Sequence, residues 1–366
     1  MTDVPFLQGL SLSVRLGQFH LDGVSLTVER GEYCAILGET GAGKSVLLEA
    51  LIGMYPSMGG QVFLEGREIT RLPPEERGLA IVYQDYMLFP HLNVYENIAF
   101  GLRRARLSRF EETSRVRAMA ERLAIEALLE RDVRTLSGGE KQRTAIARAL
   151  VTKPKVLLMD EAFSALDAST RERMRRFIGR LVKDLGTTVV HVTHDVDDVW
   201  ALADKVVIMF DGKVLQAGPP LEVFSRPLPG DVADFVGACN LFSCRAEGSE
   251  QEGLAALRCG EALFLSTDAV EPGREVLASV RPESILLARE AQDLTARNQI
   301  RGRICSTERR GPLVRICGET EAGPMTALLT ASGLEALDLS AGDEVFFIFK
   351  AGHVKILRDG EVPKAS

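Results

Sequence analysis

One eight-residue stretch constrains the fold of this chain more than any other feature of its sequence. It is a glycine-rich loop with the pattern G-x-x-x-x-G-K-S, made of Gly38, Glu39, Thr40, Gly41, Ala42, Gly43, Lys44 and Ser45. An apolar run at 34–37 precedes it, and residues 46–52 follow with apolar side chains at helical spacing. A buried strand, a glycine loop and a helix in this order predict a binding loop for nucleotide phosphates. The alternative is an ordinary glycine turn before a helix.

The chemistry of the loop favours ATP and Mg²⁺ as its ligands. Glycines allow backbone N–H groups to turn toward phosphate oxygens because no Cβ stands in the way. The following helix adds the partial positive charge of its N-terminus. We expect Lys44 to reach the β- and γ-phosphates and the Ser45 hydroxyl to ligate Mg²⁺. Val46, which follows the loop, is included in the predicted nucleotide site.

The composition limits the classes of function. The chain has 366 residues, of which 46% are hydrophobic and 26% are charged, as in a globular protein of two domains. Its net charge of −7 argues against nonspecific nucleic-acid binding, so we expect no nucleic-acid partner and expect local donors to hold ATP. No apolar run is long enough to span a membrane, and we do not expect the first five residues to form a secretion signal.

The cysteines are scattered along the chain. They occupy positions 34, 239, 244, 259, 305 and 317, and no C-x-x-C pair is among them. This spacing predicts reduced thiols in a cytosolic protein rather than a disulfide framework or a zinc site.

Hydrophobic patterning predicts an α/β fold up to about residue 215. Alternation of apolar and polar residues over 10–30 is typical of antiparallel strands with one exposed face. The apolar run that begins at 156 and ends in the two carboxylates at 160–161, and the run at 188–193, are typical of parallel strands that are covered on both faces. Between these regions, 93–134 has helical periodicity. We therefore expect a mostly parallel sheet with an antiparallel accessory sheet and a helical insertion.

The last third of the chain is rich in predicted strands. Residues 217–237 contain several prolines and glycines and form a predicted connector with one short helix, so we place the domain boundary near 238. A weak internal repeat aligns 273–281 with 342–350, and Asn240 and Asn298 each open one half. This repeat predicts two related β-barrel halves, although any pair of β-turn-β units would look similar.

Five further elements follow the glycine loop in a fixed order. They are Gln84, the stretch Leu-Ser-Gly-Gly-Glu at 136–140, Asp160 with Glu161, the stretch 164–167, and His194. With the loop, they resemble the ABC-transporter ATPase subunits over residues 10–237. The LSGGE stretch is the specific part, because most other ATPases with this kind of loop lack it. The resemblance implies an ABC-type P-loop NTPase domain over 1–237, with an antiparallel β subdomain and a helical subdomain at about 93–150.

The resemblance also implies a role for each residue of the site. Asp160 would hold Mg²⁺ through its water shell, and Glu161 would polarise the attacking water as a general base. Gln84 would touch both the metal and that water, which gives Ser45, Gln84 and Asp160 as the implied metal set. His194 would contact the γ-phosphate.

A symmetric dimer follows from the same resemblance. Ser137, Gly138 and Gly139 would face the phosphates of a second copy, and Asp167 would lie in the loop that crosses to that copy. Two identical chains would then enclose two ATP molecules about a two-fold axis. Ser137 also forms a capping-box pattern with Glu140, so an ordinary helix cap is the alternative role.

Other positions in this part of the chain have expected roles of their own. The family usually stacks an aromatic residue on adenine near Leu16; the nearest aromatic here is Phe19, and apolar contact alone is the alternative. His191 and Trp200 are predicted to be core residues. Ala162 replaces the proline that commonly follows the general base, with little expected effect.

The segment that follows Gln84 suggests a membrane partner. Residues 83–91 follow the pattern of importer ATPases, and 86–89 are four large side chains: Tyr, Met, Leu and Phe. We expect them to form a groove for a short helix of a transmembrane permease, and local core packing is the alternative. The implied position is peripheral, on the cytoplasmic face of the cell membrane, with a substrate-binding protein as an indirect partner.

Three segments of the tail, 295–302, 326–330 and 342–351, resemble the molybdenum-binding Mop domain. The resemblance implies an all-β, OB-like barrel of the Mop or TOBE kind over 238–366. The oxyanion candidates are Thr295, Ala296, Arg297, Asn298 and Lys350. Cationic, N–H and O–H donors suit a tetrahedral dianion, so bound molybdate or tungstate is a hypothetical feedback signal. The alternative is a purely structural barrel that dimerises.

By resemblance, the whole chain is similar to the ATPase subunits of molybdate and tungstate importers. An importer of sulfate or of another small solute is the first alternative. A soluble ABC-type ATPase acting on DNA or ribosomes is disfavoured by the single glycine loop, the absence of sustained heptads and the acidic balance. A small-molecule kinase would lack the LSGGE stretch. The sequence does not separate molybdate from tungstate.

Overall fold

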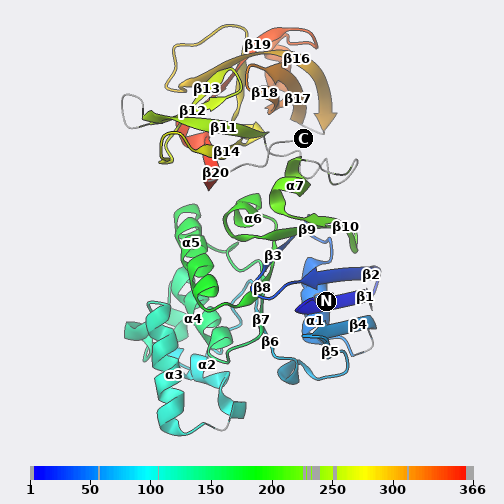
Figure 1. Cartoon of the computed structure of the whole chain (residues 1–366), viewed down its shortest axis with the longest axis vertical. Helices are drawn as coiled ribbons and strands as arrows, with labels where there is room; N and C mark the ends of the chain where they lie inside the picture. The colour runs from blue at the N-terminus through cyan, green and yellow to red at the C-terminus, as the bar shows by residue number, and fades with distance from the viewer. Residues whose placement is uncertain are drawn as a thin grey trace. The chain divides into compact units, whose positions relative to one another are not determined.

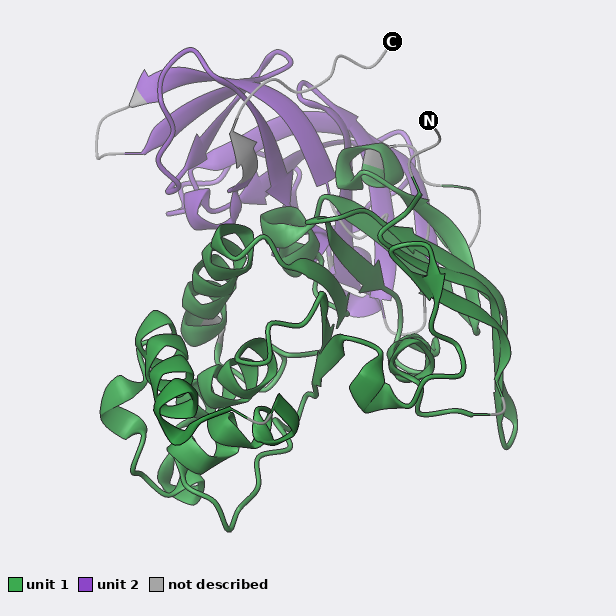
Figure 2. Cartoon of the chain, turned by 60° about the horizontal axis from the view of Figure 1, so that its bottom comes forward, with its two compact units in different colours: residues 1–232 green, residues 233–366 purple. Residues whose placement is uncertain are grey.

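The computed structural model divides the chain into two compact units, residues 1–232 and 233–366 (Figure 2). It describes residues 4–56, 58–105, 107–225, 228, 232, 240–249, 254–310 and 313–359. The predicted boundary near 238 lies outside the described residues. Among the helices of the described ranges, none combines the length and the apolar character that crossing a bilayer requires.

A six-stranded sheet forms the centre of the first unit, in the order β10-β9-β3-β8-β7-β6. Its strands are β3 (Tyr33–Leu37), β6 (Leu79–Val82), β7 (Val156–Asp160), β8 (Thr188–Thr193), β9 (Lys205–Phe210) and β10 (Lys213–Gly218). All neighbouring strands are parallel except the β9–β10 hairpin. Every residue of β3, β7 and β8 is buried, which explains their unbroken apolar runs. The predicted mostly parallel sheet is confirmed.

An antiparallel sheet in the order β2-β1-β4-β5 forms a second layer of this unit (Figure 1). Its strands are β1 (Leu7–Leu16), β2 (Phe19–Val28), β4 (Gly59–Leu64) and β5 (Arg67–Glu68). The apolar faces of both sheets and of helix α1 (Lys44–Ile52) share one core, which includes Leu12, Leu51 and Val190. This core fixes the glycine loop, because β3 ends and α1 begins on either side of it.

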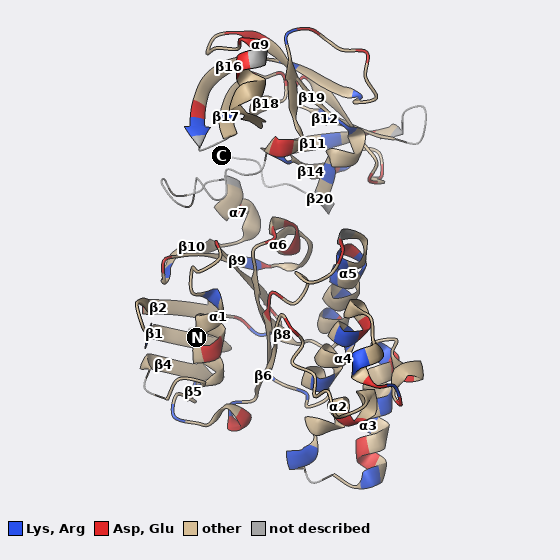
Figure 3. Cartoon of the chain, turned by 180° about the vertical axis from the view of Figure 1, so that it is seen from behind, with Lys and Arg blue, Asp and Glu red and all other residues tan. Residues whose placement is uncertain are grey.

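Three helices of the first unit start at capping boxes. The three, α2 (Val94–Phe100), α3 (Arg109–Arg122) and α4 (Gly138–Leu150), lie together at the lower left of Figure 1. Each begins with a capping box in which the cap side chain and the third helical residue exchange hydrogen bonds. Figure 3 colours both acidic (red) and basic (blue) residues along the ribbon of α3. The remaining helices are α5 (Ala168–Asp184), α6 (Val196–Leu202) and α7 (Pro220–Ser225).

The second unit is built from two repeats of the same strand order. The first repeat contains β11 (Asn240–Ser249), β12 (Ala255–Cys259), β13 (Ala262–Ser266), β14 (Glu275–Val280) and β15 (Leu286–Ala288). The second contains β16 (Asn298–Arg310), β17 (Leu313–Thr320), β18 (Gly323–Thr330), helix α9 (Ala331–Leu337), β19 (Glu344–Phe349) and β20 (Lys355–Asp359). The sheets run β13-β12-β11-β14-β20 and β18-β17-β16-β19-β15, so each repeat lends its last strand to the other. The predicted internal repeat is confirmed.

Two equivalent asparagines tie these repeats together. Asn240 opens β11, and its amide donates to Val280 O (3.0 Å) and Thr326 O (2.9 Å) and accepts from Thr326 N (2.6 Å). Asn298 opens β16, donates to Leu265 O (3.0 Å) and accepts from Leu265 N (2.6 Å). Each amide therefore bonds backbone groups of the opposite repeat, and satisfied buried amides of this kind favour one register.

The prediction that all cysteines are reduced thiols is wrong for one pair. Cys244 and Cys259 are joined by a disulfide between β11 and β12. They are directly opposite in the antiparallel register, with Cα atoms 4.3 Å apart, a contact that a sequence separation of 15 conceals. Cys34, Cys305 and Cys317 are free thiols, and burial raises the pKa of Cys34 to about 12.

Candidate nucleotide site

The glycine loop has a backbone that only glycine adopts easily. Gly41 and Gly43 lie in the left-handed region, with φ of 90° and 92°. Gly38 packs so closely on β9 that an added Cβ would lie 2.2 Å from the carbonyl oxygen of Met209. Two positions of the loop therefore require glycine because of their backbone conformation, and a third requires it because the backbone of β9 is so close.

Lys44 and Ser45 extend from the first turn of α1 toward different partners. The Lys44 ammonium is buried and donates to Gly38 O and Glu39 O, both at 2.8 Å. Burial lowers the pKa of Lys44, and the nearby carboxylates of Glu161 and Asp160 oppose that shift. The Ser45 hydroxyl donates to Asp160 Oδ1 at 2.9 Å.

Asp160, at the end of β7, provides the best-suited oxygen for a divalent cation. Burial raises the pKa of its carboxyl group; the Ser45 hydrogen bond opposes the rise, and the negative charge of Glu161 adds to it. A cation beside the carboxylate would offset this cost, and hydroxyl and carboxylate oxygens are ligands that Mg²⁺ accepts. Within the described ranges, no group of three His, Cys, Asp or Glu residues could hold a metal ion.

Glu161 lies beside His194 across two neighbouring parallel strands. His194 Nδ1 is 3.2 Å from Glu161 Oε2, and the Glu161 side chain is 18% exposed. The Glu161 backbone is in the left-handed region with φ of 43°, and its N–H donates to Val192 O on β8 at 2.9 Å. A non-glycine residue held in this conformation is often found at a functional site.

Two nucleotide candidates remain, Gln84 after β6 and Phe19 at the start of β2. Gln84 is exposed two residues after β6, whose Val82 is in register with Met159, the neighbour of Asp160. Phe19 begins β2, and its ring covers Gly43: an added Cβ there would lie 2.4 Å from Cζ of Phe19.

We use the name "sheet edge" for Lys44, Ser45, Asp160, Glu161 and His194, which the structure brings together.

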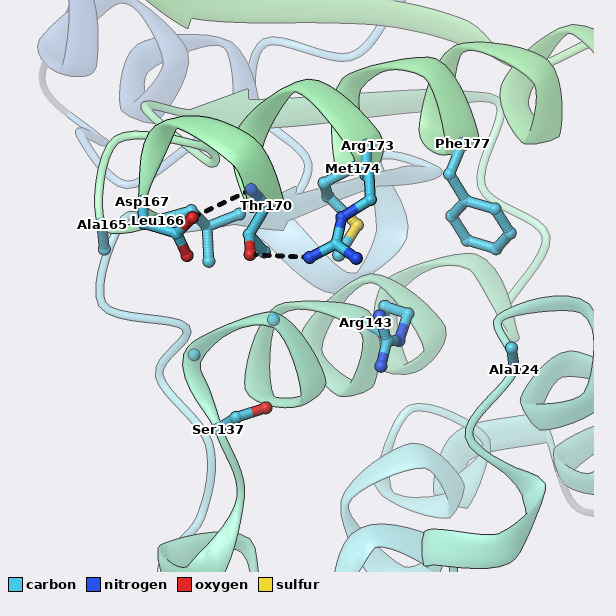
Figure 4. A pocket seen from close by; sticks show the side chains of 12 residues that line it. Ala124, Ser137, Arg143, Ala165, Leu166, Asp167, Thr170, Arg173, Met174 and Phe177 are labelled. Atoms are coloured by element: carbon cyan, nitrogen blue, oxygen red, sulfur yellow. Dashed lines mark hydrogen bonds between the residues drawn. The ribbon is translucent and has the colours of Figure 1, made fainter.

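Ser137 lies in a separate groove of about 680 Å³ between α4 and α5 (Figure 4). The groove is lined by Ala124, Ser137, Gly138, Gly139, Arg143, Ala165, Leu166, Asp167, Thr170, Arg173, Met174 and Phe177. No residue of the glycine loop belongs to this described lining. We call it the Ser137 groove. The structure therefore places Ser137, Gly138, Gly139 and Asp167 together in one groove, whose described lining includes no residue of the sheet edge.

Helix caps organise the Ser137 groove. Ser137 caps α4 by exchanging hydrogen bonds with Glu140, so the predicted capping box is present. Asp167 caps α5 through Thr170 N at 3.1 Å and also accepts from the Ser169 hydroxyl at 2.9 Å. These hydrogen bonds, led by those from Thr170, lower the pKa of Asp167 to about 2.

Sequence reasoning missed three larger side chains of this groove. Arg143 follows Gly139 by four residues on α4, and Arg173 and Phe177 are four residues apart on α5. Helical spacing from the LSGGE and 164–167 stretches was the signal that could have found them.

The loop predicted to receive a permease helix is anchored to α4. Arg148 donates to Met87 O at 2.7 Å and to Tyr86 O at 3.0 Å. Tyr86 and Met87 both have left-handed backbones, with φ of 65° and 46°. Met87 is 54% exposed, while Phe89 is half-buried against Phe100 with ring centroids 4.3 Å apart. The loop therefore offers one exposed apolar side chain on a fixed backbone.

His191 and Trp200, predicted to be core residues, are both buried. Tyr33 Oη lies 3.1 Å from His191 Nδ1, and burial lowers the pKa of His191. The imidazole therefore stays in its neutral form inside the sheet.

The oxyanion candidates of the second unit are in mixed environments. Thr295, Arg297 and Lys350 are exposed, whereas Ala296 and Asn298 are buried. Asn298 is in register with Phe349, so Arg297, just before β16, and Lys350, just after β19, are at neighbouring strand ends. The Asn298 amide bonds both backbone groups of Leu265. The two cations and Thr295 are therefore the accessible members of the predicted set.

Comparison with known proteins gives matches to both units. Residues 21–164 match the family model described as ABC transporter, and residues 294–356 match the TOBE domain. The molybdate/tungstate import ATP-binding protein WtpC of Pyrococcus abyssi is 41% identical, over 94% of this chain and 98% of its own length. The spermidine/putrescine import ATP-binding protein PotA 2 of Pseudomonas aeruginosa is 37% identical, over 96% and 98%. The solved structure of cbiO1 from Clostridium perfringens, part of the ABC transporter complex cbiONQ, has a TM-score of 0.55 and 32% identity, and the match covers 61% of this chain and 91% of that one.

Proposed function

This chain belongs to the ABC-transporter ATPase family, and from that premise we propose that it hydrolyses ATP to drive the import of molybdate or tungstate. One observation carries the ATPase part: Ser45, Asp160, Glu161 and His194 converge beside a phosphate-binding loop. The substrate rests on the relative from Pyrococcus abyssi, which aligns over 94% of the chain and 98% of its own length.

We assign ATP to the glycine loop, with Mg²⁺ beside Ser45 and Asp160. The loop's backbone N–H groups and the Lys44 ammonium would bind the phosphates. Bound Mg²⁺ supplies neutralisation of the negative charge that develops on the phosphate oxygens. Glu161 accepts the proton of the attacking water, and His194, 3.2 Å from its carboxylate, holds that carboxylate in position. Gln84 assists in orienting the water, and Phe19 is the candidate for contact with adenine.

A second copy completes the site in this proposal. Ser137 and the N-terminus of α4 would bind the terminal phosphate of the ATP held by the partner, which is consistent with their separation from the glycine loop in one chain. The exposed Met87 and its fixed loop would receive a permease helix. The chain would then lie peripherally at the cytoplasmic face of the membrane, with a substrate-binding protein as an indirect partner.

The second unit would serve as an oxyanion sensor. Arg297 and Lys350 at neighbouring strand ends, with the Thr295 hydroxyl, suit a tetrahedral dianion. Bound molybdate or tungstate would then slow hydrolysis when the ion has accumulated. Sulfate or another small solute is the second candidate substrate; the 37% identity to a spermidine/putrescine import protein supports only the wider class of small solutes.

Metal uptake by cells tests the transported substrate. Cells that lack the gene, with and without a plasmid copy, are grown in molybdate, tungstate or sulfate, and their content of each element is measured. We expect the plasmid to restore molybdenum and tungsten but to leave sulfur unchanged. Restoration of sulfur alone, or of none of the three, would overturn the assignment of substrate.

Calorimetric titration of the full chain with the same three ions tests the sensor separately. We expect heat from molybdate and tungstate but not from sulfate, and we expect Lys350→Ala to remove it. The exposed Lys213 is far from this unit in sequence, so Lys213→Ala is the control. Equal heat from the wild type and from Lys350→Ala contradicts the assigned site.

A further inference from the structure

Arg171 connects two segments that flank the proposed general base. It extends from the first turns of α5 to the segment 163–166, which links Glu161 to Asp167. Its Nε donates to Phe163 O at 3.1 Å, and its Nη2 donates to Ser164 O at 3.2 Å and to Leu166 O at 3.0 Å. Three carbonyl groups of one short segment are therefore fixed by a single guanidinium.

The third nitrogen of the same guanidinium reaches the residue that follows His194. Arg171 Nη1 lies 3.5 Å from Asp195 Oδ2, and Arg175 Nη2 lies 3.2 Å from the same oxygen. Asp195 is also fixed through its backbone and its second oxygen, because its N–H donates to Thr193 Oγ1 at 3.0 Å and its Oδ1 accepts from Asp197 N. His194 thus stands between two residues whose positions are set by this network.

The side chains that make these contacts are largely buried. The side chain of Arg171 is 28% exposed, that of Asp195 is 15% exposed and that of Arg175 is 9% exposed. Arg175 Nε also donates to Asp198 Oδ1 at 2.8 Å, and the Thr193 hydroxyl donates to Asp198 Oδ2 at 2.6 Å. In such surroundings a displaced charge loses both its solvent and its partners, so movement of one member is passed to the others.

We propose that Arg171 is a positioning residue that couples the shape of segment 163–166 to the orientation of His194 through Asp195. The inference rests on the proposed function, in which His194 holds the Glu161 carboxylate and the Ser137 groove, which Asp167 also lines, faces a second copy. Docking of the partner on 163–167 would then reset His194 and Glu161 in the same chain. Hydrolysis in one site would wait until the partner is seated on the loop beside it.

The coupling is tested on the full chain by a double-mutant cycle of Arg171→Ala and Asp195→Asn. We expect each single change to lower kcat for ATP hydrolysis about tenfold and to leave KM for ATP within about twofold. Because both act through one contact, the double variant should fall no more than about twofold below either single variant. Losses that multiply to about a hundredfold would mean that the two residues act independently, and that result would overturn the proposal.

Two further variants keep the outcome interpretable. Arg171→Lys retains the charge but not the planar fork that reaches two segments at once, so we expect it to restore less than half of the lost kcat. Arg176→Ala removes an exposed arginine that pairs with Glu172 on the same helix, and it should leave kcat unchanged. Full activity of Arg171→Lys, or equal losses in Arg176→Ala and Arg171→Ala, contradicts the coupling. If Arg171→Ala does not fold, the comparison of Asp195→Asn with Arg171→Lys and their double variant replaces the cycle.

Failure of this inference differs from failure of the proposed function. A wild-type chain without ATPase activity would remove the proposed function. A wild-type chain that hydrolyses ATP, beside an Arg171→Ala variant of equal kcat, would remove only the coupling.

Discussion

The sheet edge and the Ser137 groove carry similar side chains under opposite conditions. Asp160 at the edge is buried, and burial raises the pKa of its carboxyl group. Asp167 in the groove is exposed, and hydrogen bonds from Thr170 and Ser169 lower its pKa to about 2. The edge joins distant parts of one chain, as in the bond from Ser45 to Asp160, whereas Ser137 and Asp167 bond within the first turns of their own helices. The sheet edge therefore combines residues that are distant in the sequence, whereas the Ser137 groove is formed at the capped starts of two helices.

The largest expected effect comes from removing the proposed general base at the sheet edge. Glu161→Gln keeps the shape of the side chain but cannot accept a proton, so we expect kcat for ATP hydrolysis to fall by a factor of about 10² to 10⁴. Glu172→Gln, an exposed change on α5, serves as the control and should keep its activity.

The same variant tests whether the groove belongs to a second copy. Glu161→Gln protein with ATP and Mg²⁺ should hold the bound nucleotide and elute as a dimer, measured by size exclusion with light scattering. A strictly monomeric protein, both alone and joined to its permease, would end the two-copy interpretation of the groove.

Mixing two inactive variants sharpens the comparison further. Lys44→Ala disables the edge and Ser137→Arg blocks the groove, so each homodimer should be inactive. A mixed dimer has one site with an intact Lys44 and an intact Ser137, taken from different chains. Random mixing makes half of the dimers mixed with half of their sites intact, so about a quarter of wild-type activity should return. No recovery on mixing would place both residues in the same chain's site.

Sequence patterns anticipated these two regions unequally. The glycine loop is contiguous, so its chemistry could be inferred from residues 38–45 alone. The groove was anticipated only through the family resemblance, because nothing local in Ser137 distinguishes a helix cap from a ligand. Arg171 was not anticipated at all, since its partners Phe163 and Asp195 meet it only when the carboxyl ends of β7 and β8 lie together.

In the second unit, too, contacts between residues distant in the sequence could not be predicted. The repeat was visible in the sequence because residues 273–281 align with 342–350, with Asn240 and Asn298 upstream of them. The exchange of β15 and β20 between the sheets was not, because strand pairing depends on contacts distant in sequence. Cys244 and Cys259 were misjudged for the same reason, since their pairing follows from register alone.

A smaller effect is expected on the unfolding temperature when Asp160 of the sheet edge is replaced. Burial raises the folded-state pKa of Asp160, so its contribution to stability is greatest below its unfolded pKa and is lost as pH rises through the folded value. At pH 7 without nucleotide, Asp160→Asn should therefore unfold at a temperature higher by roughly 2 °C. With ATP and Mg²⁺, the wild type should gain more thermal stability than the variant. Calorimetric scans of both proteins measure this, and a less stable ligand-free variant contradicts the stated cost of the buried carboxylate.

The smallest expected effect concerns Asp167 in the Ser137 groove, whose pKa is lowered where that of Asp160 is raised. Hydrogen bonding lowers the folded-state pKa of Asp167 to about 2, so its contribution is present above its unfolded pKa of about 4 and is lost as pH falls through about 2. Asp167→Asn retains an acceptor for the Thr170 N–H, so its unfolding temperature at pH 7 should change by less than about 1 °C. Its stability should then decline less than that of the wild type between about pH 4 and pH 2. Denaturant titrations across that range follow the difference, with Asp197→Asn on α6 as a matched aspartate. Equal acid sensitivity of the wild type and Asp167→Asn would contradict the lowered pKa of Asp167, and with it the difference between Asp167 and Asp160.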